Sequence, residues 1–268
     1  MSLTPHQLNQ VFDELVQRMQ VQEPPLTFTS PGAPTWVVAN ALTLVQQRLP
    51  ASEDPLPDVE TLYKRVCQQQ TAWTENVIGQ SWAAASGSSF QGFVRGRLQD
   101  ALNASGIRAV SAAQLAAYGP AIRSFLTLPA RRRCVQASFE AWPDNDIMLL
   151  TRSEGTSAPP ATAVKVFGIL SCKTSFHARE TESCFWALAT RDTGVRMGLV
   201  TQDRSRELGS CQHPTKARML LEAYFDRVFV TNPHTSACAQ IRPFDEIYQE
   251  VRRWRLDVVP DAIDTPWP

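Results

Sequence analysis

Two short stretches decide the fold of this 268-residue chain. Residues 143–150 read Pro-Asp-Asn-Asp-Ile-Met-Leu-Leu, so acids stand directly before an apolar run, and residues 168–173 read Gly-Ile-Leu-Ser-Cys-Lys. Side chains alternate along a strand, which puts Ser171 and Lys173 on one face and Cys172 on the other. If the two strands are neighbours in a hairpin, the acidic end of one and the lysine end of the other converge.

The segments around these stretches alternate between strand and helix patterns. The predicted strands are Cys134–Ala141, Asn145–Thr151, Ala163–Lys173, Arg196–Thr201 and Arg227–Val230. The predicted helices between and after them are Arg179–Thr190, Lys216–Tyr224 and Phe244–Trp254. A Ser/Gly/Pro-rich loop is expected at Arg152–Ala161. This order predicts an α/β fold with a mixed central sheet flanked by helices.

The first third of the chain reads as helices instead. Apolar residues at helical spacing predict helices at His6–Met19, Thr35–Leu49 and Val59–Gln70. Ser86-Gly87-Ser88-Ser89 has the composition of a helix start and precedes a further apolar pattern. We therefore expect a mainly helical part over residues 1–105 and an α/β core over residues 106–268, together in one compact domain.

Composition sets only broad limits on function. Hydrophobic residues make up 43% and charged residues 19% of the chain, and the formal net charge is zero, as in ordinary globular proteins. A neutral total neither requires nor excludes nucleic acid, because binding needs only a local basic face. None of the six cysteines has zinc-site spacing, and the sequence shows neither a signal peptide nor an apolar run of membrane-spanning length. The expectation is a cytoplasmic protein with reduced thiols.

Carboxylates beside a lysine are the residue types that phosphodiester hydrolysis needs. Carboxylate oxygens hold Mg²⁺, and a lysine can orient the attacking water and offset negative charge. Asp146 is preferred to Asp144 as the first metal ligand because it directly enters the apolar run. A single acid is a poor Mg²⁺ site, so a second is expected. Glu182 can supply it from the following helix, with Glu180 as an alternative on a different side of that helix.

Each of these residues also has a plainer structural interpretation. Asp146 could cap a turn, Lys173 could be a charged strand end, and Glu182 could be a solvated helix residue paired with Arg179. Arg131-Arg132-Arg133 is typical of a solvated run, although Arg132 could contact a phosphate. Cys172 is disfavoured as a nucleophile because its strand position directs it into the core. The combination of acid, apolar strand, lysine and helix favours the catalytic interpretation.

The motif as a whole resembles type II restriction endonucleases of the PD-(D/E)xK superfamily. The residues that carry the resemblance are Pro143, Asp144 and Asp146, then Ser171-Cys172-Lys173-Thr174-Ser175 and Arg179. The most similar branch cuts sites containing CCGG or CC-N-GG and includes AgeI, BsaWI, NgoMIV and EcoRII. In that branch a small residue such as serine replaces the acid before the lysine, and a glutamate of the next helix takes its role. Ser171 and Glu182 match this pattern.

The resemblance implies a function and its residues. It implies Mg²⁺-dependent, site-specific double-strand cleavage of a short palindrome, with Asp146, Glu182 and Asp144 as metal ligands and one or two ions per active site. Catalytic residues would be Asp146, Lys173, Glu182 and Ser171. Bases would be read by Arg179, with His177, Glu180 and Ser175 beside it. Two departures from the family are Gln91, where a further glutamate is common, and His177, where Arg or Lys is common.

The same resemblance implies partners. A palindrome has two-fold symmetry, so a homodimer is expected at least on DNA. A bacterial host would need a cognate methyltransferase to protect its own DNA. Apart from the resemblance, the helical part is expected to wrap DNA, form the dimer surface or simply wrap the sheet. Two other hypotheses remain open: a repair or structure-selective nuclease of the same fold, which would lack sequence choice, and a non-catalytic DNA-binding module, which would not depend on metal.

Overall fold

The computed structural model describes residues 2–28, 30, 32–50, 54–118, 128–131, 138–141, 146–154, 162–174, 180–203 and 206–267. The chain divides into two compact units, Met1–Gly92 and Phe93–Pro268. None of the described helices is both long and apolar enough to cross a membrane.

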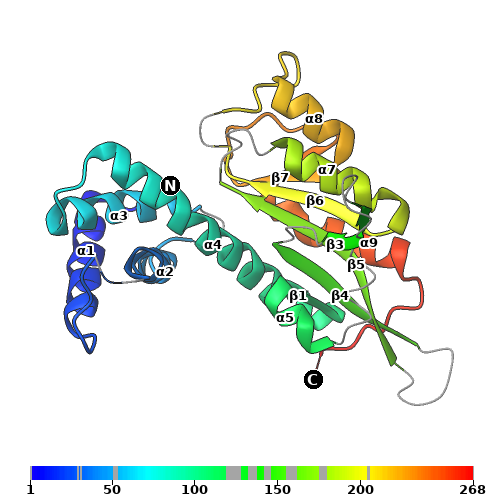
Figure 1. Ribbon diagram of the computed structural model, residues 1–268, viewed down its shortest axis with the longest axis horizontal. Coiled ribbons are helices and arrows are strands. Elements are labelled where there is room, and N and C mark those ends of the chain that lie inside the picture. Colours follow the sequence, from blue (N-terminus) through cyan, green and yellow to red (C-terminus); the bar gives the residue numbers. More distant parts are fainter. Residues whose placement is uncertain are drawn as a thin grey trace. The chain divides into compact units, whose positions relative to one another are not determined.

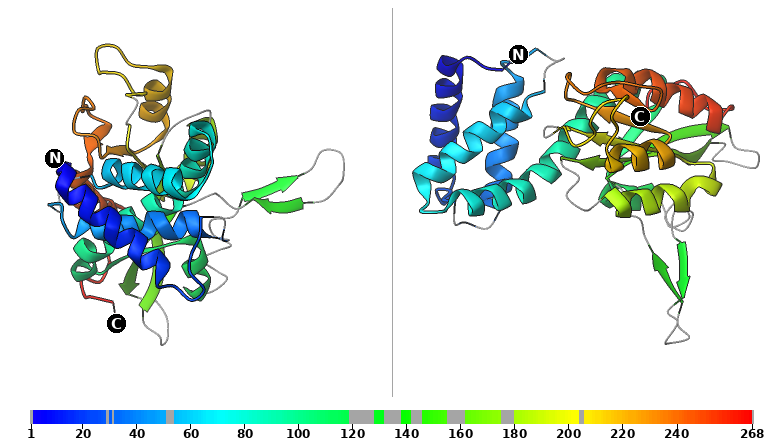
Figure 2. Two further views of the ribbon diagram at one scale, coloured as in Figure 1. Left: turned by 90° about the vertical axis from the view of Figure 1, so that its left-hand side faces the viewer. Right: turned by 90° about the horizontal axis from the view of Figure 1, so that it is seen from above.

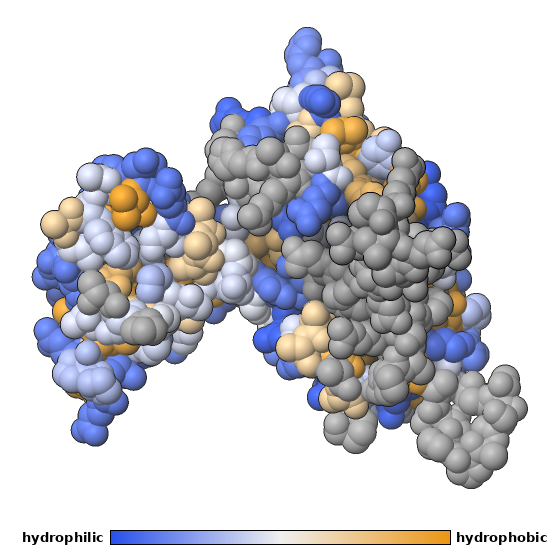
Figure 3. All heavy atoms as spheres, viewed as in Figure 1, coloured by the Kyte–Doolittle hydropathy of each residue, from blue (hydrophilic) through white to orange (hydrophobic). Residues whose placement is uncertain are grey.

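The N-terminal unit is built from helices with buried apolar faces. Its helices are α1 (Pro5–Gln20), α2 (Ala33–Gln46), α3 (Leu56–Gln70) and the first part of α4 (Glu75–Leu102). Thr4 and Gln7 form a capping box that starts α1. Leu15, Val38 and Tyr63 are buried, whereas the surface drawn in Figure 3 is mainly hydrophilic with scattered apolar spots. The three helices predicted before residue 71 are confirmed within a few residues at each end.

The predicted helix start at Ser86–Ser89 is wrong, because α4 begins at Glu75 and runs through these serines. The helix starts after Thr74, whose carbonyl accepts a hydrogen bond from the Ile78 N–H at 3.0 Å. A serine can remain inside a helix when its hydroxyl bonds the carbonyl of the preceding turn. Ser89 does so, donating to the Ala85 carbonyl at 3.3 Å.

The C-terminal unit contains a six-stranded mixed sheet with the order β1-β4-β5-β6-β7-β8 (Figure 1). Its strands are β1 (Ile107–Val110), β4 (Ile147–Glu154), β5 (Thr162–Lys173), β6 (Arg196–Thr201), β7 (Arg227–Val230) and β8 (Ile241–Pro243). β1, β4 and β5 pair in antiparallel fashion, whereas β5 to β8 are parallel. A separate two-stranded sheet is formed by β2 (Leu128–Arg131) and β3 (Ser138–Ala141) (Figure 2).

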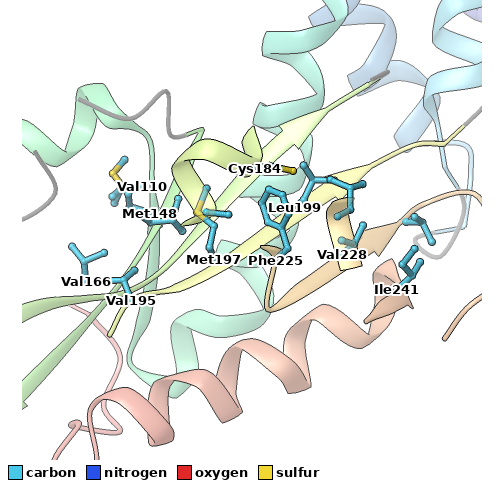
Figure 4. Close-up of a cluster of buried hydrophobic side chains, with 14 of the residues drawn as sticks. Val110, Met148, Val166, Cys184, Val195, Met197, Leu199, Phe225, Val228 and Ile241 are labelled. Atoms are coloured by element: carbon cyan, nitrogen blue, oxygen red, sulfur yellow. The ribbon is translucent and has the colours of Figure 1, made fainter. Parts of the chain in front are cut away.

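Helices cover both faces of the six-stranded sheet. α7 (Glu180–Thr190) and α8 (Lys216–Tyr224) lie on one side and α9 (Ile247–Val258) on the other. The other helical segments among the described residues of this unit are the second part of α4, α5 (Ala112–Leu115), η1 (Asn103–Ser105), η2 (Ala116–Tyr118), η3 (Arg191–Thr193) and η4 (Phe244–Glu246). The side chains of Met148, Met197 and Leu199 gather on the face under α7, where Cys184 of that helix joins them (Figure 4).

The predicted α/β fold with a mixed central sheet and a helical N-terminal part is confirmed. The bounds of β6, α8 and β7 agree with the sequence prediction, and β5 differs by one residue. The structure adds β1 and β8, two short edge strands that no sequence pattern singled out. It also extends β4 to Glu154, three residues into the predicted loop.

A buried arginine connects α8 to the segments that follow β6 and β7. The Arg218 side chain is fully buried and donates to Glu222 Oε1 at 2.7 Å and to the Ser236 carbonyl at 3.0 Å. Burial acts to lower the pKa of Arg218, but its hydrogen bonds to Glu222 and Cys238 outweigh burial and raise that pKa. These bonds hold segments at the carboxyl edge of the parallel strands, the edge at which β5 ends in Lys173.

Replacement of Gly198 by alanine is expected to destabilise the C-terminal unit. A Cβ at Gly198 would lie 2.7 Å from Leu170 Cδ2 and 2.8 Å from Trp254 Cη2, where β6 meets α9. Such overpacking costs about 1–3 kcal/mol of unfolding free energy, which urea denaturation would measure. Gly96→Ala is the matched control, because a Cβ added at Gly96 would have nothing within 4 Å. This variant should not lose stability, since alanine is more favourable than glycine in a helix by about 1 kcal/mol. Equal stability of Gly198→Ala and the wild-type protein would contradict this packing.

Candidate active site

The pairing of β4 with β5 brings an aspartate to the end of the lysine-bearing strand. Ile147 pairs with Leu170 in antiparallel register, which places Asp146 opposite Ser171. Asp146 Oδ2 accepts hydrogen bonds from the Cys172 backbone N–H at 2.5 Å and from Ser171 Oγ at 3.4 Å. The carboxylate is therefore fixed against the last residues of β5.

Lys173 lies beside the same carboxylate oxygen. Its Nζ is 4.0 Å from Asp146 Oδ2, and the two side chains are 16% and 17% exposed, respectively. This distance is too long for a hydrogen bond but keeps the two opposite charges in a partly dry pair, where they interact more strongly than in water. The structure thus shows the convergence of acid and lysine that the hairpin arrangement predicted.

The site lies on the face of the sheet covered by α7. Ile169 belongs to the core cluster under α7, and Ser171 and Lys173 share its face because they follow it at intervals of two. The parallel partner of Lys173 in β6 is Thr201, which is fully buried. A hydroxyl thus stands next to the ammonium-bearing strand end. The sequence could not indicate this neighbour, because no local pattern fixes the register of two parallel strands.

Glu182 reaches the same edge of the sheet by a different route. β5 and β6 are parallel, so α7 returns the chain from the end of β5 to the start of β6. The first turn of α7 therefore lies at the carboxyl edge, and Glu182 belongs to that turn with an exposed side chain. Glu182 therefore lies at the same edge of the sheet as Asp146 and Lys173. Among the described residues, it forms no ion pair with Lys173.

The donor set suits a hydrated, hard cation. Within the residues that the structure describes, no three His, Cys, Asp or Glu side chains form a ready metal cage. Mg²⁺ does not need one, since it keeps several waters and binds through one or two carboxylates together with substrate phosphates. Asp146 at the strand end and Glu182 on α7 are the described carboxylates that could hold it, with Ser171 contacting the first.

Several predicted site residues lie outside the described residues: Asp144, Ser175, His177, Arg179 and Arg132. Glu180 is the first residue of α7, but its side chain is not described. Gln91 lies in α4, within the N-terminal unit.

The chemistry of a thiol nucleophile does not fit Cys172. Its side chain is buried, and burial raises the pKa of the thiol well above its usual value, with the Asp146 carboxylate adding to the increase. A thiolate, the reactive form, is therefore strongly disfavoured at this position. Cys172 contributes its backbone N–H to Asp146 and its side chain to the core.

The chain is similar to restriction endonucleases in both sequence and structure. Residues 131–250 match the family model described as BsaWI restriction endonuclease type 2. The AgeI restriction endonuclease in a specific DNA complex has a similar structure, with a TM-score of 0.64 and 17% identity over 94% of this chain and 93% of that one. BsaWI in a pre-specific DNA complex matches at a TM-score of 0.44 and 12% identity over 94% and 91% of the two chains. A comparison with curated proteins found no significant match.

The likeness to AgeI supports the fold, and the family match covers the segment that contains Asp146, Ser171, Lys173 and Glu182. Through residues 131–250, this chain is similar to the type II restriction endonucleases, the family that its motif resembles.

Proposed function

We propose that this protein is a type II restriction endonuclease that makes Mg²⁺-dependent double-strand cuts at a short palindromic DNA site containing CCGG. The observation that carries the proposal is the contact of Asp146 with the end of β5, which holds a carboxylate 4.0 Å from the Lys173 ammonium. This pair lies inside the segment that matches the restriction endonuclease family.

The residues at this edge have complementary tasks in phosphodiester hydrolysis. A bound divalent ion supplies charge neutralisation at the phosphate and lowers the pKa of the attacking water. Asp146, held by the Cys172 N–H, and Glu182 are the proposed ligands of one or two such ions. The Lys173 ammonium orients the water and offsets the negative charge that develops on the phosphate. Ser171 supports Asp146 through its hydroxyl.

Sequence choice is assigned to the segment after Lys173. The guanidinium of Arg179 has the geometry to donate to O6 and N7 of a guanine in the major groove. His177, Glu180 and Ser175 are proposed as its neighbours at the bases, and Arg132 as a phosphate contact that positions DNA without reading it. The structural neighbour AgeI is itself described in a specific DNA complex, which supports duplex DNA as the substrate.

A palindromic substrate implies two copies of the chain. Each copy would cut one strand, so the protein is proposed to act as a homodimer at least when bound to DNA. The biological role would be defence of a bacterial cell against foreign DNA, with a methyltransferase that protects the host site.

Lys173→Ala and Asp146→Ala are expected to abolish DNA cleavage. Purified protein incubated with phage DNA should give discrete bands that require Mg²⁺, and both variants should lose at least about a hundredfold in rate, as removal of electrostatic stabilisation does in enzymes. Cys172→Ala is the matched control, because it alters the neighbouring side chain on the opposite face and keeps the backbone N–H. Metal-dependent smears would indicate a nuclease without sequence choice. Uncut DNA under all metals would support a non-catalytic DNA-binding module.

Glu182→Gln is expected to raise the Mg²⁺ concentration needed for half-maximal cleavage by about tenfold or more, because one anionic ligand is lost. The variant should bind DNA without metal as the wild-type protein does. Asp192→Asn, which removes an exposed carboxylate just beyond the opposite end of α7, serves as the comparison and should leave the metal dependence unchanged. An unchanged Mg²⁺ titration for Glu182→Gln would assign the second carboxylate elsewhere.

Arg179→Ala is expected to weaken binding to the cleavage site by about ten- to hundredfold, the value of one bidentate guanine contact, with little change for unrelated DNA. Gel-shift titrations at one fixed salt concentration would measure both affinities. Arg252→Ala, which removes an exposed arginine of α9, is the control and should not change the ratio. A uniform loss on both DNAs would make Arg179 a phosphate contact.

A further inference from the structure

A buried threonine stands next to Lys173 in the sheet. In the parallel pairing of β5 with β6, Lys173 is the register partner of Thr201, and Ser171 is the partner of Leu199. Register partners on neighbouring strands project to the same face and lie about 4.8 Å apart across the sheet. Thr201 is therefore the β6 residue whose side chain stands beside that of Lys173.

The hydroxyl of Thr201 has no hydrogen-bond partner among the described residues, although the side chain is fully buried. An unpaired buried hydroxyl costs stability, so proteins rarely keep one without another use for it. The residues before it in β6, Leu199 and Val200, are apolar and fully buried. Valine has the same shape as threonine and would fill this position without that cost. The packing of the strand alone therefore does not account for the hydroxyl.

Among the described residues, the Lys173 ammonium has no hydrogen-bond acceptor. An ammonium group has three donors, yet the contact described for Nζ is the ion pair with Asp146 Oδ2 at 4.0 Å, beyond hydrogen-bond distance. A lysine ammonium is carried on a flexible stem of four carbons, so one ion pair without a hydrogen bond leaves the ammonium poorly oriented. To stabilise the negative charge that develops in the transition state, the ammonium must be held in place before the reaction.

We propose that Thr201 is a positioning residue of the nuclease site, whose hydroxyl accepts a hydrogen bond from the Lys173 ammonium, directly or through one water, when DNA is bound. The ammonium then contacts Asp146, which directly precedes β4, and Thr201 of β6. Lys173 is thus held by groups from both strands that flank β5. The hydroxyl lowers the stability of the free protein and contributes to the rate of cleavage. This role rests on the proposed nuclease function.

The test compares Thr201→Val, which removes only the hydroxyl, with Thr201→Ser, which keeps it. Single-turnover cleavage of a duplex that carries the protein's own site should slow by about ten- to hundredfold in Thr201→Val, the value of a hydrogen bond to a charged group. The dissociation constant for the same duplex in EDTA should stay within about twofold. Thr201→Ser should cut within about threefold of the wild-type rate. The melting temperature of Thr201→Val should equal or exceed that of the wild-type protein.

Thr151→Val is the matched control for stability. Thr151 is also fully buried, but its hydroxyl donates to the Gly106 carbonyl at 3.3 Å and accepts from Arg255 Nε at 3.0 Å. Its loss leaves a buried guanidinium N–H unpaired, so this variant should melt at a lower temperature and still cut DNA at the wild-type rate below that temperature. The two variants should therefore show opposite effects on stability and rate.

Two results would overturn the role of Thr201. One is cleavage by Thr201→Val at the wild-type rate while Lys173→Ala is inactive, which would leave the proposed nuclease function intact. The other is a slow Thr201→Val that also melts early and is not rescued by Thr201→Ser, which would make the residue purely structural. A wild-type protein that cuts no DNA under any metal would instead overturn the nuclease function itself, and this role with it.

Discussion

The antiparallel pairing of β4 with β5 is the constraint on which the site depends. The register that places Ile147 opposite Leu170 also places Asp146 opposite Ser171, and a slip of one residue would turn the aspartate to the other face. The register is strongly specified because both faces of the sheet are covered: Met148 and Ile169 pack under α7, whereas Gly168 lies against Trp254 of α9. Burial of apolar side chains thus determines the position of a carboxylate, and the Cys172 N–H then orients it.

The change from antiparallel to parallel pairing at β5 explains why the site lies at this edge. On one side β5 pairs with β4, which Asp146 directly precedes, and on the other side it pairs with β6, whose last residue is Thr201. The crossover from β5 to β6 through α7 adds Glu182 at the same edge. One strand end therefore brings an ammonium, a carboxylate and two hydroxyls together from three segments of the chain, and Glu182 lies on the helix that follows it. A phosphate and a hydrated cation need such a set of groups at the margin of a rigid sheet.

Local sequence patterns were sufficient for β5, β6, α8 and the convergence of Asp146 with Lys173, since alternation and apolar runs report directly on strand faces. The start of α4 was not predictable from its serines, because a serine hydroxyl can cap a helix or, like that of Ser89, bond within one. β1 and β8 are too short to show a period and exist because neighbouring strands pair with them. The neighbour relation between Lys173 and Thr201 depends on a parallel register, which packing sets over the whole unit.

In the proposed function, Asp146 and Lys173 act as one unit in the cleavage of DNA. A double-mutant cycle of single-turnover cleavage rates, with Asp146→Ala, Lys173→Ala and the double variant, tests it most directly. Residues that act as a unit give strongly non-additive losses, so the account predicts that the double variant cuts no more slowly than the slower single variant. Losses that multiply in the double variant would show that the two residues act independently and would contradict the account.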